Sequence, residues 1–187
     1  MPQLMIVVGS VRPGRIGLPI ARWVESAALA HGAFEIDVVD LAELDLPFMD
    51  EPNHPRLRSY TQQHTIDWSA RVDAADAIVF VTPEYNHSFS PALKNAIDYL
   101  HTEWSHKPAG FVSYGGVSAG TRGVIALQPA LVGLGVVLSQ PNVEINFPGK
   151  QLNDDGEFEP TEQQASVAAA LLTELAALAG VLKPLQG

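Results

Sequence analysis

Short apolar segments, nearly continuous in Val, Ile and Ala, alternate along the chain with longer segments whose apolar residues recur every three to four positions. A continuous apolar run is typical of a strand buried on both faces, and the longer pattern is typical of a helix with one buried side. Strands that alternate with helices in this way form a parallel sheet covered on both faces. The predicted strands lie at residues 4–8, 36–39, 77–81, 109–113 and 136–138.

Three helices are predicted from their apolar spacing. The stripes are formed by Ile16, Ile20, Val24 and Ala27, by Leu93, Ile97 and Leu100, and by Val167, Leu171, Leu175 and Leu178. Ser90 before Pro91 is typical of a helix start, and Thr161 and Gln164 have the spacing of a capping box.

Two further helices are expected at 59–75 and at 121–134, the second with Pro129 as a possible kink. The connection from 41 to about 58 is long for a compact domain and rich in proline, so we expect a flap beside a site or a partner contact.

Five strands suffice for a doubly wound sheet, and we expect a flavodoxin-like three-layer sandwich with the parallel order 2-1-3-4-5 and helices on both faces. At ~150 residues per domain, the 187 residues predict a single domain spanning 1–187.

The amino-acid composition argues against several classes of function. The chain has no cysteine, which excludes disulfides, thiolate nucleophiles, cysteine-ligated zinc and iron–sulfur clusters. A net charge of −10 argues against a nucleic-acid partner. The apolar run 4–8 is too short for a signal or a membrane span, so we expect a cytoplasmic protein that does not bind membranes.

The first strand runs into residues 9–17 and then into a helix, a junction that favours anion binding. Ser10, Arg12 and Arg15 supply hydrogen-bond donors there, which suit a terminal monophosphate. A simpler interpretation is that both arginines are solvated surface charges.

Two better-known phosphate motifs are absent from this junction. Gly9 and Gly14 have P-loop spacing, but Arg15 and Ile16 stand where that motif needs Lys and Ser or Thr. Val11 occupies the position of the second glycine of the dinucleotide motif. An NTPase and a Rossmann dinucleotide site are therefore disfavoured.

Polar or glycine-rich loops also follow the third and fourth strands, at 82–91 and 113–120. In the order 2-1-3-4-5 these loops and the arginine loop meet at one edge of the sheet. A phosphate site at one end and glycine backbones at the other suit a flat heterocycle with a phosphorylated tail, which describes flavin mononucleotide (FMN).

Across residues 4–180 the chain resembles the NAD(P)H-dependent FMN reductases, flavodoxin-like enzymes that include quinone, chromate and azo-dye reductases. The resemblance rests on Gly9-Ser10-x-Arg12, Pro83-Glu84-Tyr85-Asn86, Leu93-Lys94-Asn95-Ala96-Ile97-Asp98 and Ser113-Tyr114-Gly115-Gly116.

The resemblance implies a set of cofactor contacts. Ser10, Arg12 and Arg15, with the helix start at Ile16 and Gly17, would hold the FMN phosphate. Pro83, Glu84, Tyr85 and Asn86 would line the isoalloxazine edge, and Ser113, Tyr114, Gly115 and Gly116 would bind its pyrimidine side. Tyr85 and Tyr114 are each expected either to flank the ring or to pack beneath the loops.

The flavin carries the hydride chemistry, so no residue of the chain needs a catalytic role. NADPH or NADH would reduce the flavin, and a small acceptor (free flavin, a quinone, chromate or an azo compound) would then use the same face, which predicts ping-pong kinetics. His87, Ser118 and Arg122 are candidates for substrate contacts, and Arg122 is also a candidate for binding a 2′-phosphate.

Three alternatives compete with a reductase. Gly116-Val117-Ser118-Ala119-Gly120 matches the nucleophile elbow of a serine hydrolase, although every histidine lies upstream of it, where that fold needs its histidine downstream. His101, Glu103 and His106 suggest a metal site, but their spacing does not fit one helical face and we expect no metal. An electron carrier of the same fold would bind FMN without using a pyridine nucleotide.

The segment 91–103 is predicted as one helix that carries Tyr99 and Trp104 besides its core stripe. The two aromatic residues either belong to the core or form an exposed patch suited to self-association. By resemblance we expect a homodimer or homotetramer with the flavin near the subunit boundary.

Overall fold

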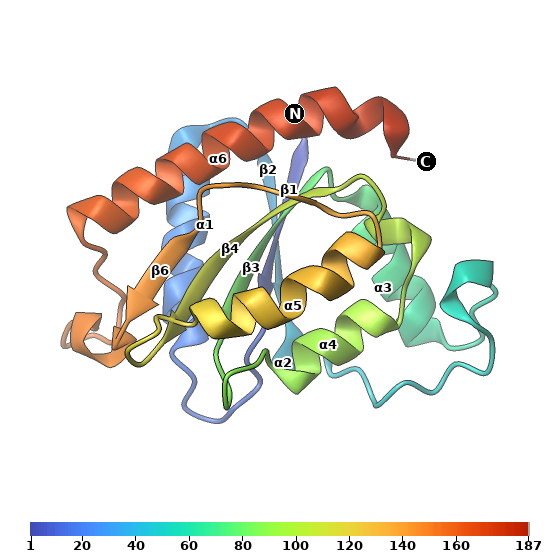
Figure 1. Ribbon diagram of the computed structural model, residues 1–187, viewed down its shortest axis with the longest axis horizontal. Helices are drawn as coiled ribbons and strands as arrows, with labels where there is room; N and C mark the ends of the chain where they lie inside the picture. Colours follow the sequence, from blue (N-terminus) through green and yellow to red (C-terminus); the bar gives the residue numbers. More distant parts are fainter. Residues whose placement is uncertain (187) are drawn as a thin grey trace.

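The computed structural model describes residues 1–186 and contains a six-stranded sheet in the order β2-β1-β3-β4-β5, with β6 also paired to β4. All the pairs are parallel. The strands are β1 (Gln3–Val8), β2 (Glu35–Asp40), β3 (Ala77–Pro83), β4 (Pro108–Gly115), β5 (Val137–Leu138) and β6 (Val143–Asn146). The predicted flavodoxin-like order 2-1-3-4-5 is confirmed (Figure 1).

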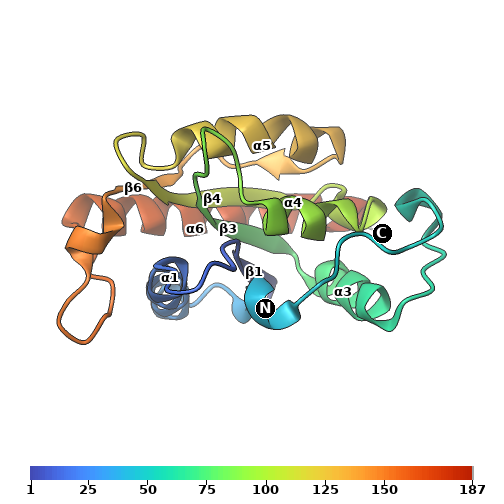
Figure 2. The same ribbon diagram turned by 90° about the horizontal axis from the view of Figure 1, so that it is seen from below.

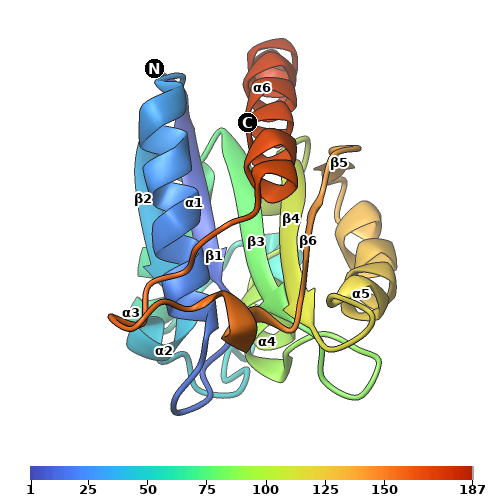
Figure 3. The ribbon, with the colours of Figure 1, turned by 90° about the vertical axis from the view of Figure 1, so that its left-hand side faces the viewer.

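Helices cover both faces of the sheet (Figures 1 and 3). They are α1 (Gly17–His31), α2 (Leu41–Leu44), α3 (Gln63–Ala74), α4 (Pro91–Asp98), α5 (Thr121–Gly133) and α6 (Glu162–Leu182), with short 3-10 turns η1 (Pro55–Leu57), η2 (Thr102–Trp104), η3 (Pro148–Gln151) and η4 (Lys183–Leu185). Residues of α1 and α6 share one core cluster, and residues of α3, α4 and α5 share the other.

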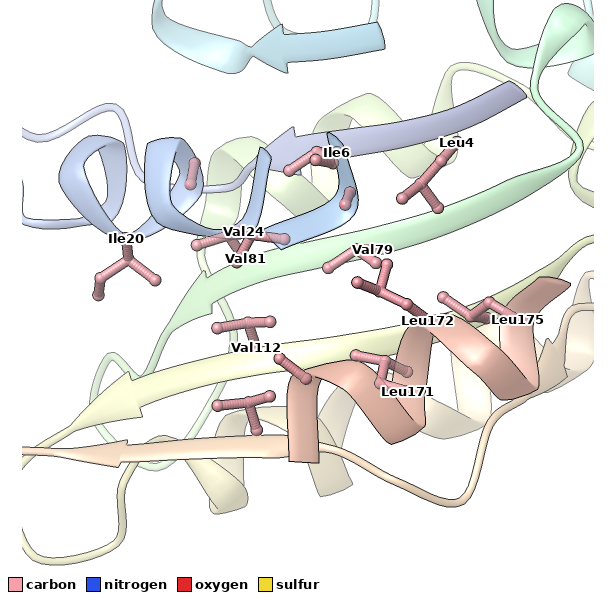
Figure 4. Close-up of a cluster of buried hydrophobic side chains, with 14 of the residues drawn as sticks. Leu4, Ile6, Ile20, Val24, Val79, Val81, Val112, Leu171, Leu172 and Leu175 are labelled. Atoms are coloured by element: carbon pink, nitrogen blue, oxygen red, sulfur yellow. The ribbon is translucent and has the colours of Figure 1, made fainter. Parts of the chain in front are cut away.

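Successive residues of β1 explain why its sequence is apolar throughout. Leu4 and Ile6 pack with α1 and α6, as Figure 4 shows, whereas Met5 and Val7 pack with the helices of the other face. Side chains of a strand alternate between its faces, so a strand covered on both sides needs an apolar residue at every position.

The fifth strand differs from its prediction. Only Val137 and Leu138 form β5, which pairs with the start of β4, and the second half of β4 pairs instead with β6. The sequence of β6 alternates between buried and exposed residues, with Glu144 exposed. A short edge strand of this kind lacks the continuous apolar run on which the prediction depended.

The predicted helix starts are confirmed in position. Thr161 and Gln164 form the capping box of α6 in full. Ser90 precedes α4 as expected, but its buried hydroxyl has no partner within residues 1–186. The two helices expected at 59–75 and 121–134 are α3 and α5, and Pro129 lies within α5.

The segment 91–103 is not one helix, because α4 ends at Asp98 and η2 follows separately. Tyr99 and Trp104 are both fully buried in the core. Of the two alternatives for these residues, the core position is confirmed and the exposed patch is excluded. Their buried polar groups are satisfied, since Trp104 Nε1 donates to the Ile97 carbonyl at 3.0 Å and the Tyr99 hydroxyl donates to the Pro47 carbonyl at 3.0 Å.

The long connection between α2 and α3, teal in Figure 2, runs outside the core past α4. Asn95 on α4 fastens it: the side-chain amide donates to the Pro47 carbonyl at 2.7 Å and accepts from the Met49 N–H at 3.2 Å. The connection is thus tied to the helix that follows the β3 loop.

Helix α6 with η4 is long and apolar enough, by length and composition, to cross a membrane. Its core-facing residues nevertheless pack on the sheet, and Leu171 lies directly against Gly110 of β4. A core helix of a soluble protein passes the same test, so this feature is weak evidence for a span.

Candidate flavin site

Three loops leave the sheet at the same edge, at the carboxyl ends of β1, β3 and β4 (Figure 3). Val8 is in register with Val81, and Pro83 is in register with Tyr114, so neighbouring strands end side by side. The first loop comprises residues 9–16, the second 84–90 and the third 116–120. Their predicted convergence is confirmed by direct contacts between them.

The first loop is attached closely to β3. The Gly9 N–H donates to the Val81 carbonyl at 2.9 Å, and a Cβ at Gly9 would lie 3.3 Å from the same oxygen. Ser10 is buried, and its hydroxyl shares a 2.8 Å hydrogen bond with the Tyr85 hydroxyl of the second loop. Ser10 and Tyr85 therefore join two of the three loops.

The start of α1 is open to an anion. Ile16 is its N-cap and offers no side-chain acceptor, and the first turn carries no acidic residue. The first N–H groups of a helix lack partners within the helix, and the helix dipole adds positive charge there.

Tyr114 lies beneath this helix start and adds a second donor to it. Only 7% of the residue is exposed, its hydroxyl lies against Gly17, and that hydroxyl has no partner within residues 1–186. Burial raises the pKa of Tyr114 far above its ordinary value, so the phenol keeps its proton. Of the two expectations for Tyr114, packing beneath the loops holds, and its free O–H suits a phosphate oxygen.

The two arginines of the first loop differ. Arg12 is exposed, whereas Arg15 forms an ion pair with Asp40 at the end of β2. Asp40 is buried and also caps α2, accepting from the Ala42 N–H at 3.0 Å. In this structure the Arg15 side chain therefore holds the loop to β2, and Arg12 is the arginine left to meet a ligand.

The second loop contains a tight hairpin. Tyr85 and Ser88 exchange backbone hydrogen bonds of 2.9 and 3.0 Å, and the two residues between them, Asn86 and His87, have φ of 50° and 67°. Positive φ at both central positions defines a type I′ turn. Asn86 and His87 are exposed at the tip of this turn.

The third loop folds tightly onto the end of β4. The Ser113 hydroxyl donates to the Ala119 carbonyl at 2.9 Å, so this residue stabilises the loop from below. Gly120 has φ of 85°, and a Cβ there would lie 2.6 Å from the Tyr114 nitrogen. Gly116 remains exposed at the rim.

Glu84, Ser118 and Arg122 were expected at the flavin edge or at the substrate, but the structure pairs them with one another. Ser118 Oγ donates to Glu84 Oε2 at 2.7 Å, and Arg122 Nε donates to Glu84 Oε1 at 2.6 Å. Arg122 also donates to Ser118 Oγ at 3.1 Å. Among the described residues Ser118 has no histidine partner, so a serine hydrolase is not supported.

Burial of Glu84 acts to raise its pKa, but the hydrogen bonds from Arg122 and Ser118 outweigh burial and lower the pKa below its ordinary value. The carboxyl group therefore remains ionised between the two loops.

The turn after β6 also borders the site, next to the three loops, and the sequence did not predict it. The Phe147 N–H donates to the Gly115 carbonyl at 2.7 Å, and a Cβ at Gly149 would lie 3.7 Å from Ile16. Phe147 has φ of 47°, and Lys150 Nζ lies 5.3 Å from its ring centroid. Neither residue belongs to a recognisable motif, and only the fold brings them to the site.

His101, Glu103 and His106 lie near the start of β4, at the opposite end of that strand from the loops. Glu103 is buried and accepts hydrogen bonds from Tyr60 and Ser69 at 2.6 and 2.7 Å. Within the chain as described, no group of three or more His, Cys, Asp or Glu residues is arranged to hold a metal.

The sheet order and the loops at its carboxyl edge define a flavodoxin-like α/β protein. The structure superposes with a TM-score of 0.77 on a flavoenzyme NAD(P)H:(acceptor) oxidoreductase of Paracoccus denitrificans, at 22% identity over 97% of this chain and 98% of that one. It also superposes on an archaeal flavodoxin, with a TM-score of 0.56 at 10% identity over 96% and 99% of the two chains.

The sequence profile of the NADPH-dependent FMN reductase family matches residues 2–148, and the chain belongs to this family. An NAD(P)H-dependent FMN reductase of Schizosaccharomyces pombe is 41% identical over 121 residues, 64% of this chain and 60% of that protein. One of Saccharomyces cerevisiae is 41% identical over 140 residues, 69% and 73% of the two chains. A quinone reductase of Pseudomonas putida is 32% identical over 148 residues, which cover 76% of this chain and 74% of that protein.

Proposed function

We propose that this protein is an FMN-dependent NAD(P)H oxidoreductase that reduces small electrophilic acceptors. The observation that carries the proposal is the meeting of three loops at one sheet edge, beside a helix start without a side-chain cap and a buried Tyr114 hydroxyl that no group of residues 1–186 pairs with. These groups fit a phosphate at one end and a flat ring at the other. Family membership supports the same cofactor.

The phosphate would be held mainly by backbone and by neutral donors. The N–H groups around Ile16 and Gly17 and the Tyr114 hydroxyl offer hydrogen bonds, and Arg12 supplies the positive charge. Ser10 retains a role as a donor through its backbone, because its hydroxyl is shared with Tyr85. Arg15 would contribute only if it left Asp40.

The ring would lie along the rim between the second and third loops. Asn86 at the hairpin tip and Gly116 in the third loop are both exposed residues, and their backbone N–H groups would donate to the ring without a side chain. Pro83 and Gly115, the last residues of β3 and β4, would form the floor between the loops, and His87 remains a candidate contact for a substrate.

Bound FMN would take a hydride from a reduced nicotinamide and deliver reducing equivalents to an acceptor. The chain's own contribution is to bind and orient the ring and leave one side of it accessible at the open rim. Because both substrates would use that side, we expect ping-pong kinetics.

The names of the relatives guide the choice of acceptor. They include a 2-hydroxy-1,4-benzoquinone reductase of Burkholderia, at 29% identity, and FMN-dependent NADPH-azoreductases of Staphylococcus. We propose quinones and azo compounds as the first acceptors to assay, with free flavin and chromate after them. A cytoplasmic homodimer or homotetramer remains our proposal for the native state.

The test is a titration of the purified protein with FMN, followed by visible absorption and flavin fluorescence. We expect saturable binding, weakened about tenfold in Arg12→Ala through loss of a charge-assisted contact. Arg22→Ala, an exposed arginine on α1, is the matched control and should leave the affinity unchanged. A parent protein that does not bind FMN would contradict the proposal.

A second assay separates an enzyme from an electron carrier. With FMN bound, the protein should oxidise NADPH or NADH continuously when a quinone is present. A protein that binds FMN but shows no such turnover is a carrier.

A further inference from the structure

Glu84, Ser118 and Arg122, here called the loop clamp, join the second and third loops through one carboxylate. Besides the side-chain contacts described above, Glu84 Oε2 accepts from the Arg122 backbone N–H at 3.2 Å. The Arg122 guanidinium also forms an ion pair with Glu84 Oε1. Both carboxylate oxygens are therefore occupied within the clamp.

The clamp also completes the start of α5. Gly120, the N-cap of that helix, has no side chain, and the first turn contains no acidic residue. The Glu84 carboxylate, contributed by the second loop, accepts from an N–H of this first turn. A carboxylate at this position is favoured by the helix dipole and by the unpaired N–H groups. Glu84 thus caps a helix to which it does not belong.

Backbone packing shows how closely the two loops are held. A Cβ at Gly123 would lie 2.9 Å from the Ser88 carbonyl and 3.4 Å from the Pro83 carbonyl, so only glycine allows this approach. The Glu84 N–H donates to the Tyr114 carbonyl at 3.2 Å. The hairpin and the first turn of α5 therefore form one packed unit with the clamp at its centre.

Only 6% of the Glu84 side chain is exposed, against 46% for Arg122. A buried carboxylate that loses its partner strongly destabilises the folded state, so breaking the clamp should destabilise the two loops that contain it. The exposed residues Asn86 and Gly116 belong to the two loops that the clamp joins.

We propose that Glu84, Ser118 and Arg122 are positioning residues that fix the spacing of the two ring-binding loops, and thereby set the affinity and the reduction potential of bound FMN. The inference rests on the proposed function. It gives the Gly-x-Ser-x-Gly sequence around Ser118 a role in loop geometry in place of nucleophilic catalysis.

The test compares Glu84→Gln, Ser118→Ala, Arg122→Met and the double variant Glu84→Gln/Arg122→Met, each as the FMN-loaded full chain. We expect the dissociation constant for FMN to rise about tenfold in Glu84→Gln and Arg122→Met, and the two-electron midpoint potential to change. The double variant should bind FMN no more weakly than the single variant with the higher dissociation constant, because both substitutions remove the same interaction. Lys94→Met, which breaks an exposed ion pair with Asp98 on α4, is the control and should match the parent.

Hydrogen exchange of the full chain supplies a readout that does not depend on the cofactor. Backbone amides of 84–88 and 116–123 should exchange faster in Glu84→Gln, while those of β1 keep their protection. If Glu84→Gln does not fold, Ser118→Ala, which removes one hydroxyl group, decides in its place. Clamp variants with the parent's affinity, potential and exchange would overturn the clamp alone, whereas a parent that binds no FMN would overturn the proposed function as well.

Discussion

Gly17 begins α1 directly above the Tyr114 hydroxyl, and there is no room between them for a methyl group. We predict that Gly17→Ala lowers the free energy of unfolding by about 1–3 kcal/mol, because overpacking forces the helix start or the tyrosine to shift. The same shift should weaken FMN binding. Urea denaturation and FMN titration measure the two effects.

Gly180 on α6 provides the matched control for this substitution. A Cβ there meets no atom of the described residues within 4 Å, so Gly180→Ala should stabilise the protein by roughly 0.5–1 kcal/mol through higher helix propensity. Equal effects of the two substitutions would contradict the packing assigned to Gly17.

Arg15 and Asp40 form an ion pair in which the side chains are only 18% and 5% exposed. We predict that Arg15→Met destabilises the FMN-free protein by about 3 kcal/mol, because it leaves a buried carboxylate without its partner. Asp40→Asn added to this variant should recover much of the loss, since the amide oxygen can still accept from Ala42. Denaturation of the single and double variants measures the coupling, and strictly additive losses would contradict it.

At the scale of elements, α4 serves as the anchor of the long connection between α2 and α3. Asn95→Ala removes both hydrogen bonds to Pro47 and Met49. We predict cleavage by a nonspecific protease several-fold faster within 45–53, because local opening becomes easier there than in the core. Lys94→Ala, one residue away on the same helix, should not change the cleavage rate.

The same elements show what sequence patterns reveal and what they leave out. Leu4 to Val8 and Ala77 to Val81 were predictable because both faces of each strand are buried. Phe147 was not, because its neighbour Gly115 lies more than thirty residues away in the sequence. Arg15 was assigned to the ligand because no local pattern shows that Asp40, at the end of another strand, takes its charge.

Convergence of the three loops, in contrast, followed from sheet order alone, since parallel strands place their carboxyl ends at one edge. The side-chain partners within that edge did not follow. The Glu84 carboxylate pairs with Arg122, and the Tyr114 side chain packs beneath the start of α1. Such choices depend on contacts between residues distant in sequence.

At the scale of the whole molecule, Glu103 links stability to pH. Burial acts to raise the pKa of Glu103, but hydrogen bonds from Tyr60 and Ser69 outweigh it and lower the pKa below its ordinary value of 4.5. A carboxyl group with a lower pKa in the folded state adds stability above pH 4.5, which is lost as the pH falls through the folded value.

We therefore predict that Glu103→Gln flattens the fall in unfolding free energy below pH 4.5, while Tyr60 and Ser69 still find an acceptor. Urea denaturation across this pH range measures the slope. Glu144→Gln, which removes an exposed carboxylate, is the control. A slope unchanged by Glu103→Gln would show that other groups carry the acid sensitivity.

The central claim is that one sheet edge binds FMN by its phosphate at the start of α1, with the ring between the hairpin and the Gly116 loop. A crystal structure of the FMN complex tests this most directly. We predict the phosphate within hydrogen-bond distance of the Gly17 N–H and the Tyr114 hydroxyl, beside Arg12. A flavin bound at any other surface, with the Tyr114 hydroxyl still unpartnered, would contradict the account.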